Sequence, residues 1–267
     1  MNILDEIVER RRERLAAEQA ALPLAEIQAR LRDLDDAPRP FGEALQGPQV
    51  RVIAEIKRAS PSQGQMVEML DPRTLAKDYT GAGAAAISVL TERDYFQGEG
   101  ADLRRARRVV PVPVLRKDFL VEEYQLYESR LLLADAVLLI VRVLSTEQLA
   151  DYLALARELG MEALVETHSE EEVETALEAG ALVVGVNNRD LDTLETDLAV
   201  TERLGGMVPL NRTLVSESGV RSAAEVERLA RAGVDAVLVG GRLMQDVDPA
   251  RALRGLVGIP ADRERRG

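Results

Sequence analysis

The sequence contains no cysteine, no tryptophan and a single histidine among its 267 residues. Without cysteine, the chain has no disulfide, no thiolate nucleophile and no cysteine-ligated zinc. One histidine is too few for a histidine-rich metal site. Any chemistry must therefore come mainly from carboxylates, amines, amides and hydroxyls, and we expect neither a metal nor a cofactor.

Long apolar runs and an excess of basic residues are also missing. No stretch approaches the roughly 18 apolar residues that span a bilayer, and the N-terminal sequence MNILDEIVERRRERL lacks the apolar core of a signal peptide. A formal net charge of −12 argues against a broad nucleic-acid or anionic-membrane surface. We therefore expect a cytoplasmic protein with no nucleic-acid or membrane partner, as a monomer or weak homo-oligomer.

Lysine is scarce as well. Only Lys57, Lys77 and Lys117 occur, so arginine supplies the other 31 of the 34 basic residues. A chain that uses arginine for most solvated charge keeps lysine where a side chain must release a proton, because a desolvated amine does so near neutral pH and a guanidinium does not. Lys57 and Lys117 end apolar strand patterns, whereas Lys77 lies on a helical pattern, where we expect it at the surface.

Apolar runs of strand length alternate with longer amphipathic patterns of helical period. This alternation predicts parallel strands covered by helices, and eight such runs in a chain of this length favour a closed (β/α)8 TIM barrel over an open doubly wound sheet. We expect one barrel domain over residues 1–267, with residues 1–50 as an N-terminal helical extension. The predicted strands are 52–56, 85–90, 112–117, 136–141, 162–167, 182–187, 213–218 and 236–241.

The working residues of such barrels project from the C-terminal ends of the strands. In the first predicted strand, alternation puts Glu55 and Lys57 on one face, opposite Ala54 and Ile56. Several amines and carboxylates in one partly dry pocket make a proton-transfer set, because burial and pairing shift their pKa values toward neutrality. Structural ion pairing is the competing interpretation. The other residues expected at this end of the barrel are Lys117, Glu166, Asn187, Glu217 and Ser218.

Glycine-bearing turns follow the last two predicted strands, in SESGVRS and VGGRLM. Backbone N–H groups in such turns bind anions together with a helix N-terminus, and phosphate sites of (β/α)8 barrels often follow the seventh and eighth strands. Tight turns need glycine in any case. The position of these two turns nevertheless predicts a phosphate-binding site.

Seven segments occur in order at the predicted strand ends: IAEIKRASPSQG, SVLTERDYFQG, PVLRKDF, LVETH, GVNNRDL, VSESGV and VGGRLM. With ILDEIV and FGEAL nearer the N-terminus, they resemble indole-3-glycerol phosphate synthase up to about residue 244. The resemblance implies ring closure of 1-(o-carboxyphenylamino)-1-deoxyribulose 5-phosphate to indole-3-glycerol phosphate, with loss of CO2 and water. This is a carboxy-lyase reaction of tryptophan biosynthesis.

The resemblance also implies roles for single residues. Lys117 or Lys57 would protonate the alkoxide that forms when the anilino ring attacks the ribulose carbonyl, and Lys57 would also hold the substrate carboxylate. Glu166 would be the base of the dehydration, with Glu55 orienting the amines and Asn187 meeting a sugar hydroxyl. The implied substrate-binding residues are Phe96, Leu115 and Phe119 at the aromatic ring, Ser60, Ser218, Gly219, Gly240 and Gly241 at the phosphate, and Arg189 and Glu217 elsewhere, Ser218 also being a catalytic candidate.

Two other classes of function stay open at this point. A different phosphate-binding barrel enzyme, such as a phosphosugar isomerase or a Schiff-base aldolase, would use the same fold and one amine, and borohydride trapping would expose an imine-forming lysine. A non-catalytic barrel that only binds a phosphorylated ligand is the remaining alternative. It gives no reason to keep lysine at two strand ends in a chain dominated by arginine.

Overall fold

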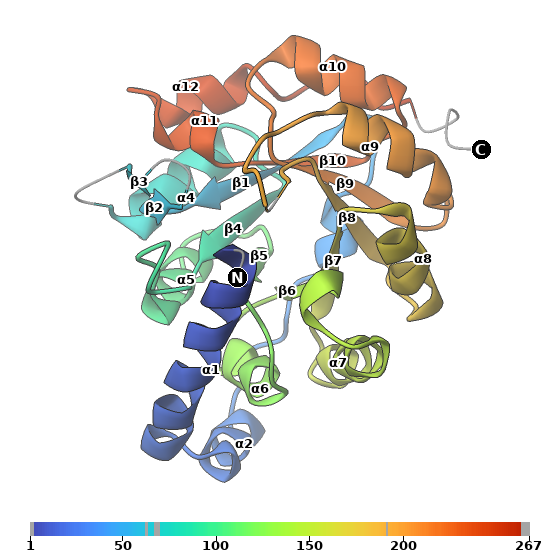
Figure 1. Cartoon of the computed structure of the whole chain (residues 1–267). Coiled ribbons are helices and arrows are strands. Elements are labelled where there is room, and N and C mark those ends of the chain that lie inside the picture. Colours follow the sequence, from blue (N-terminus) through green and yellow to red (C-terminus); the bar gives the residue numbers. More distant parts are fainter. Residues whose placement is uncertain (1–2, 62–63, 67–69, 191, 263–267) are drawn as a thin grey trace.

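Parallel strands and helices alternate along the computed structural model, which describes residues 3–61, 64–66, 70–190 and 192–262. Within these residues, the strands close into a barrel in the order β1-β10-β9-β8-β7-β6-β5-β4 (Figure 1). This confirms the predicted (β/α)8 barrel. The barrel strands are β1 (Arg51–Ile56), β4 (Ala86–Leu90), β5 (Val114–Lys117), β6 (Ala136–Ile140), β7 (Glu162–Thr167), β8 (Val183–Asn187), β9 (Thr213–Glu217) and β10 (Ala236–Val239).

Helices cover the outside of the barrel (Figure 1). Serine residues cap three of them: Ser145 and Ser222 form capping boxes, and the hydroxyl of Ser169 accepts the N–H of Glu172. Among the described residues, none of the helices combines the length and apolar character of a membrane span. The helices after β1 are α4 (Pro72–Gly81), α5 (Gly100–Arg107), α6 (Tyr124–Leu131), α7 (Thr146–Glu158), α8 (Glu170–Glu178), α9 (Ala199–Leu204), α10 (Ala223–Arg231), α11 (Gly241–Met244) and α12 (Pro249–Arg254), with short turns η1 (Val141–Val143) and η2 (Gly205–Met207) and a hairpin of β2 (Ala59–Ser60) and β3 (Gly64–Gln65).

All eight predicted strands overlap the barrel strands of the described chain, but three of them end early, the predicted strand 136–141 by one residue, at Ile140 before η1. The predicted strand 213–218 ends at Glu217, because Ser218 adopts a φ of +66°. The predicted strand 236–241 ends at Val239, because Gly240 leaves the extended region with a ψ of −65° and Gly241 begins α11. The last two differences lie where the chain turns from a strand toward the barrel mouth.

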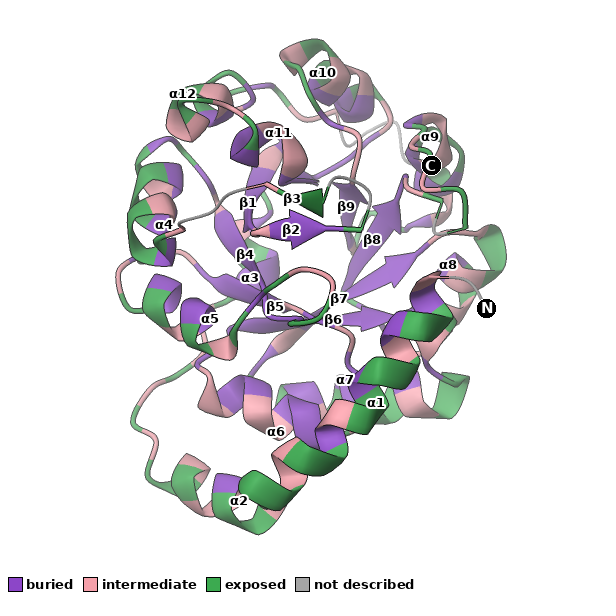
Figure 2. Cartoon of the chain, turned by 60° about the vertical axis from the view of Figure 1, so that its left-hand side comes forward, coloured by how far each residue is buried: buried purple, intermediate pink, exposed green. Residues whose placement is uncertain are grey.

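The barrel strands are buried on both faces (Figure 2). On β1, Val52, Ala54 and Ile56 belong to the apolar cluster between the strands and the helices, whereas Ile53 belongs to a separate cluster inside the barrel. Side chains alternate along a strand, so Glu55 shares the inner face with Ile53. The same alternation aims the last inner residue of each strand at the mouth of the barrel.

The N-terminal extension consists of α1 (Ile3–Ala21), α2 (Leu24–Arg32) and α3 (Phe41–Ala44). Helix α1 lies beside α6 (Figures 1 and 2), where Leu15 packs with Tyr124 in a small apolar cluster. Arg11 is buried on α1, 3.5 Å from Asp118 beyond the end of β5 and 2.7 Å from Glu18. These contacts fix the first turns of α1 next to the barrel mouth. Lys77 is exposed on α4, as predicted.

Candidate active site

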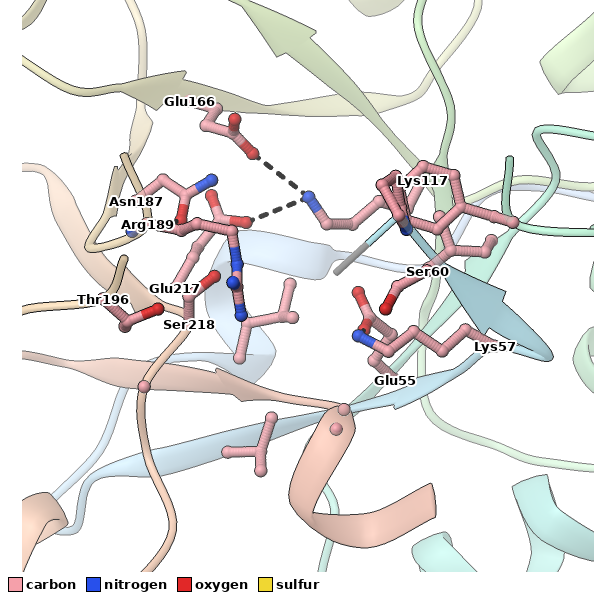
Figure 3. Close-up of a pocket in the computed structure, with 18 of the residues that line it drawn as sticks. Glu55, Lys57, Ser60, Lys117, Glu166, Asn187, Arg189, Thr196, Glu217 and Ser218 are labelled. Carbon is pink, nitrogen blue, oxygen red and sulfur yellow. Dashed lines mark hydrogen bonds and ion pairs between the residues drawn. The ribbon is translucent and has the colours of Figure 1, made fainter. Parts of the chain in front are cut away.

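A cavity of about 410 Å³ opens at the C-terminal end of the barrel. Polar side chains at the ends of several strands point into it (Figure 3). Every residue predicted for the site lines this cavity, with the exception of Leu115. The lining residues among the predicted set are Glu55, Lys57, Ser60, Phe96, Lys117, Phe119, Glu166, Asn187, Arg189, Glu217, Ser218, Gly219, Gly240 and Gly241.

Leu115 lies below the cavity and is not among the residues that line it. Its side chain is fully buried in the apolar cluster inside the barrel, together with Ile53 and Leu138. Leu115 and Lys117 share the inner face of β5, but Leu115 stands two residues deeper. The structure therefore does not bring Leu115 to the surface that a substrate would contact.

Glu55 and Lys57 form an ion pair at the end of β1 (Figure 3). The Nζ atom of Lys57 lies 2.7 Å from Oε2 of Glu55, and the Glu55 side chain is only 5% exposed. This confirms that the two side chains share one face. A Cβ atom at Gly240 would collide with the Glu55 carboxylate, so the close approach of the β10 turn requires glycine.

Lys117 lies between two buried carboxylates (Figure 3). Its Nζ atom is 3.1 Å from Oε2 of Glu166 and 3.2 Å from Oε2 of Glu217. The carboxylate of Glu217 has no hydrogen-bond partner within the described residues and packs against Gly185, where a Cβ atom would not fit. One ammonium therefore faces two acids at the centre of the cavity.

Burial and charge give these three groups unequal pKa values. Burial disfavours the ammonium of Lys117, but Glu166, Glu217 and Glu55 outweigh this effect and raise its pKa. Burial likewise opposes ionisation of Glu166, yet Lys117, followed by His168 and Asn187, lowers its pKa below the usual value. Burial raises the pKa of Glu217 to about 7, against the opposing effect of Lys117. Of these three groups, only Glu217 has a pKa that shifts toward neutrality, so the expectation of such a shift is wrong for Lys117 and Glu166. Glu166 is the ionised carboxylate of the pair.

The turns after β9 and β10 lie next to each other at one side of the cavity, because β9 and β10 are neighbours in the barrel. Ser218 and Gly219 adopt φ values of +66° and +91°, and a Cβ atom at Gly219 would lie 2.7 Å from the methyl group of Thr196. Glycine is therefore required at position 219. Arg221 and Arg242 line the same cavity and supply positive charge to this side.

Two further polar residues of the cavity are Asn187, the last residue of β8, and Arg189, two residues beyond the strand. Asn187 accepts the backbone N–H of Arg189 through Oδ1, at 3.1 Å, and its amide lies against Glu166. The guanidinium of Arg189 donates to the carbonyl of Leu194 at 2.7 Å. Arg189 is thereby held over the mouth of the barrel by the loop that follows β8.

Apolar side chains form the wall opposite to these polar groups. The rings of Phe96 and Phe119 are 6.2 Å apart, and Ile3, Leu4 and Ile7 of α1 complete the wall. The three α1 residues were not predicted for the site. Their spacing marks one apolar face of a helix, but the spacing does not say which surface that face covers. Thr196, Arg221 and Arg242, which come from loops and helix starts, were missed as well.

This arrangement suits proton transfer to and from a bound anion. Two amines and three carboxylates lie within one largely buried cavity, beside an apolar wall and the two glycine-bearing turns after β9 and β10. A buried amine paired with an ionised carboxylate delivers and recovers protons over a short distance. The apolar wall fits a planar ring, and the turns fit a phosphate.

Solved structures with the same fold bind or act on varied molecules. The chain is similar to thiamine phosphate pyrophosphorylase from Pyrococcus furiosus, with a TM-score of 0.58, 17% sequence identity, and coverage of 78% of this chain and 93% of that chain. It is also similar to 3-hexulose-6-phosphate synthase from Salmonella typhimurium, with a TM-score of 0.58, 19% identity, and coverage of 78% and 96%. At these identities the likeness supports the barrel fold alone.

Sequence relatives are far closer. The family model of indole-3-glycerol phosphate synthase matches residues 4–256. The chain is 46% identical over 258 residues to indole-3-glycerol phosphate synthase of Dehalococcoides mccartyi strain CBDB1, covering 96% of this chain and 100% of the relative. It is 47% identical over 267 residues to that of Kineococcus radiotolerans, covering 98% and 97%. The chain therefore belongs to the indole-3-glycerol phosphate synthase family.

Proposed function

We propose that Lys117 and Glu166 carry the proton transfers of indole ring closure, with Lys57 and Glu55 as a supporting pair. The chain is a carboxy-lyase of tryptophan biosynthesis, as its family membership shows. The reaction converts 1-(o-carboxyphenylamino)-1-deoxyribulose 5-phosphate into indole-3-glycerol phosphate, CO2 and water. The position of Lys117 between two carboxylates, at 3.1 and 3.2 Å, is the observation that carries the proposed roles.

The first step of the reaction needs an acid. Attack of the anilino ring on the sugar carbonyl leaves an alkoxide, and Lys117 donates the proton that neutralises it. Its raised pKa does not prevent this transfer, because an alkoxide is a still stronger base. Lys57, whose Nζ atom is held 2.7 Å from Glu55, binds the carboxylate of the substrate until CO2 leaves and the ring becomes aromatic again.

The dehydration needs both an acid and a base. The hydroxyl group leaves as water after it takes a second proton from Lys57, which is released from the substrate carboxylate once CO2 has left, and Glu166 removes one proton from the carbon next to the ring nitrogen. Glu166 suits the base role because neighbouring cations keep it ionised. It lies 3.1 Å from Lys117, so the proton that it collects can return to the amine. Asn187 meets a sugar hydroxyl beside it.

The rest of the substrate fits the remaining cavity wall. Phe96 and Phe119 contact the aromatic ring, and Ser60 together with the turns after β9 and β10 binds the phosphate. The ion pairing of Lys117 speaks against a Schiff-base aldolase, because imine formation requires a neutral amine, whereas the pKa of Lys117 is raised.

We also propose a cellular location, an oligomeric state and a domain organisation for the chain. The chain works in the cytoplasm on a small phosphorylated substrate, as a monomer or weak homo-oligomer. It does so without nucleic acid, and its formal net charge of −12 supports that absence. Residues 1–267 act as one barrel domain, with residues 1–50 as an extension. The contact of Arg11 with Asp118 supports this view, because it ties α1 to the barrel next to Lys117.

Turnover of the anilino substrate tests the proposed function. The chain contains no tryptophan, so the indole fluorescence of the product can be followed without background from the protein. We expect the indole product, measured by its fluorescence, and CO2 to form in equal molar amounts. Fluorescence without CO2, or no product from folded protein, would contradict the assignment.

A further inference from the structure

The one histidine of the chain contacts the oxygen of Glu166 that Lys117 leaves free. Lys117 Nζ lies 3.1 Å from Oε2 of Glu166, and His168 Nε2 lies 3.4 Å from Oε1. His168 follows β7, two residues after Glu166, and its side chain is only 7% exposed. It is not among the residues that line the cavity, so it would act on the reaction through Glu166.

Glu172, in the first turn of α8, contacts the other side of the imidazole ring. Oε2 of Glu172 lies 3.1 Å from Nδ1 of His168 and also accepts the backbone N–H of His168 at 2.7 Å. Glu172 is itself fixed, because its N–H donates to the hydroxyl of Ser169, the residue that caps α8. The ring is thereby held in one orientation between β7 and α8.

Both ring nitrogens face carboxylates. A neutral imidazole donates from one nitrogen only, so its other lone pair would point at a carboxylate oxygen. Nε2 is buried without a hydrogen-bond partner in the described residues, and the Glu166 oxygen is its ion-pair neighbour. Two N–H donors, and hence a positive charge, match this surrounding.

The other charged groups near the ring do not reverse the preference of His168 for its positively charged form. Arg142 of η1 lies 3.4 Å from Oε1 of Glu172 and opposes a second positive charge, as does burial itself. Glu172 and Glu166 nevertheless outweigh both effects and raise the pKa of His168. Lys117 of β5 is the remaining cation of the group, on the far oxygen of Glu166.

We infer that His168 is a positioning residue of the reaction: as an imidazolium, it orients the Glu166 carboxylate and keeps it ionised. This rests on the proposed role of Glu166 as the base. With one cation on each oxygen, the carboxylate is fixed in direction, and its proton-accepting form persists to lower pH. Glu172 acts one step further away, because it holds His168 in the charged form.

The charge of His168 can be read directly by NMR. The chain has a single histidine, so the ring nitrogen signals of a histidine-labelled sample need no assignment. We expect both nitrogens to be protonated at about pH 7 in the folded chain, with a titration midpoint above the ordinary value of roughly 6.5. Glu172→Gln should lower the midpoint. A neutral ring at about pH 7 would overturn the inference, whatever the enzyme turns over.

The effect on Glu166 is read from the pH profile of turnover. His168→Gln should lower kcat on the order of tenfold on the acid side of the profile, and much less at the optimum, because Glu166 then takes up protons at higher pH. KM should stay within about twofold, since His168 does not line the cavity.

Ser145→Ala is the matched control, because it removes the serine cap of another helix, α7, without changing a charge or a contact of His168. It should lower the melting temperature but leave the shape of the pH profile unchanged. A profile for His168→Gln that matches the one for Ser145→Ala would overturn the inference. If the unsubstituted chain forms no product, the proposed function fails, and the NMR midpoint still decides whether His168 is an imidazolium.

Discussion

Lys117 and Glu166 meet across the intervening strand β6, with 3.1 Å between Nζ and Oε2. The amine comes from β5 and the carboxylate from β7, so the contact depends on closure of the barrel and not on neighbouring residues of the chain. Glu217 approaches the same amine from β9 at 3.2 Å. The protonation states of the three groups are consequently linked.

Glu217→Gln should change the pH dependence of stability. A carboxyl group whose pKa rises on folding, here to about 7, contributes stability below its unfolded pKa and loses it as pH rises through the folded pKa. The free energy of unfolding of the variant, relative to the unsubstituted chain, should therefore increase between about pH 5 and pH 8, on the order of 2–3 kcal/mol. Urea unfolding at both pH values measures it, and a constant difference would contradict the raised pKa.

Glu55→Gln should lower kcat about a hundredfold while KM changes less. The carboxylate holds Lys57 at 2.7 Å, and this support matters most when charge moves in the transition state. Steady-state kinetics measure both parameters, with Glu158→Gln on the exposed end of α7 as the control. Full turnover by Glu55→Gln, or a change in KM alone, would make the ion pair purely structural.

Inorganic phosphate should stabilise the chain against thermal unfolding, and Gly219→Asp should abolish this protection. In the unsubstituted chain, phosphate at a concentration of a hundred times its Kd should increase the free energy of unfolding by about 2–3 kcal/mol. In the variant, the new carboxylate at the turn after β9 would repel the phosphate. Because any side chain is strained at the φ of +91°, Gly219→Ala serves as the control for strain alone. Equal phosphate-induced shifts in melting temperature for Gly219→Asp and the unsubstituted chain would place the phosphate elsewhere.

Strand periodicity was sufficient to predict the barrel and the shared face of Glu55 and Lys57. The pairing of Glu55 with Lys57 follows from their spacing of two on one strand. Alternation could not predict how deep in the barrel each inward-facing side chain lies. Leu115 has the correct face but lies one layer below the cavity, because alternation does not say where the substrate ends and the packed interior begins.

Residues that reach the site from outside the strands could not be predicted from periodicity. Ile3, Leu4 and Ile7 line the cavity only because α1 is fixed to the barrel, partly through Arg11 and Asp118, which are far apart in the sequence. His168 was missed for a related reason. A lone histidine in a loop gives no periodic signal, and its importance depends on α8 bringing Glu172 to its other nitrogen.

Lys117→Arg separates positive charge from proton release. If Lys117 is the general acid, the variant should keep the fold and a positive charge yet lose about 10²–10⁴ in kcat, because the planar guanidinium spreads its charge over three nitrogens and does not place one acidic N–H at the position of Nζ between the two carboxylates. Lys77→Arg, on the exposed side of α4, should keep full activity. The measurement is the rate of indole fluorescence from each purified variant. Near-normal turnover by Lys117→Arg would contradict proton donation by Lys117 and reduce its pairing with Glu166 to a structural ion pair.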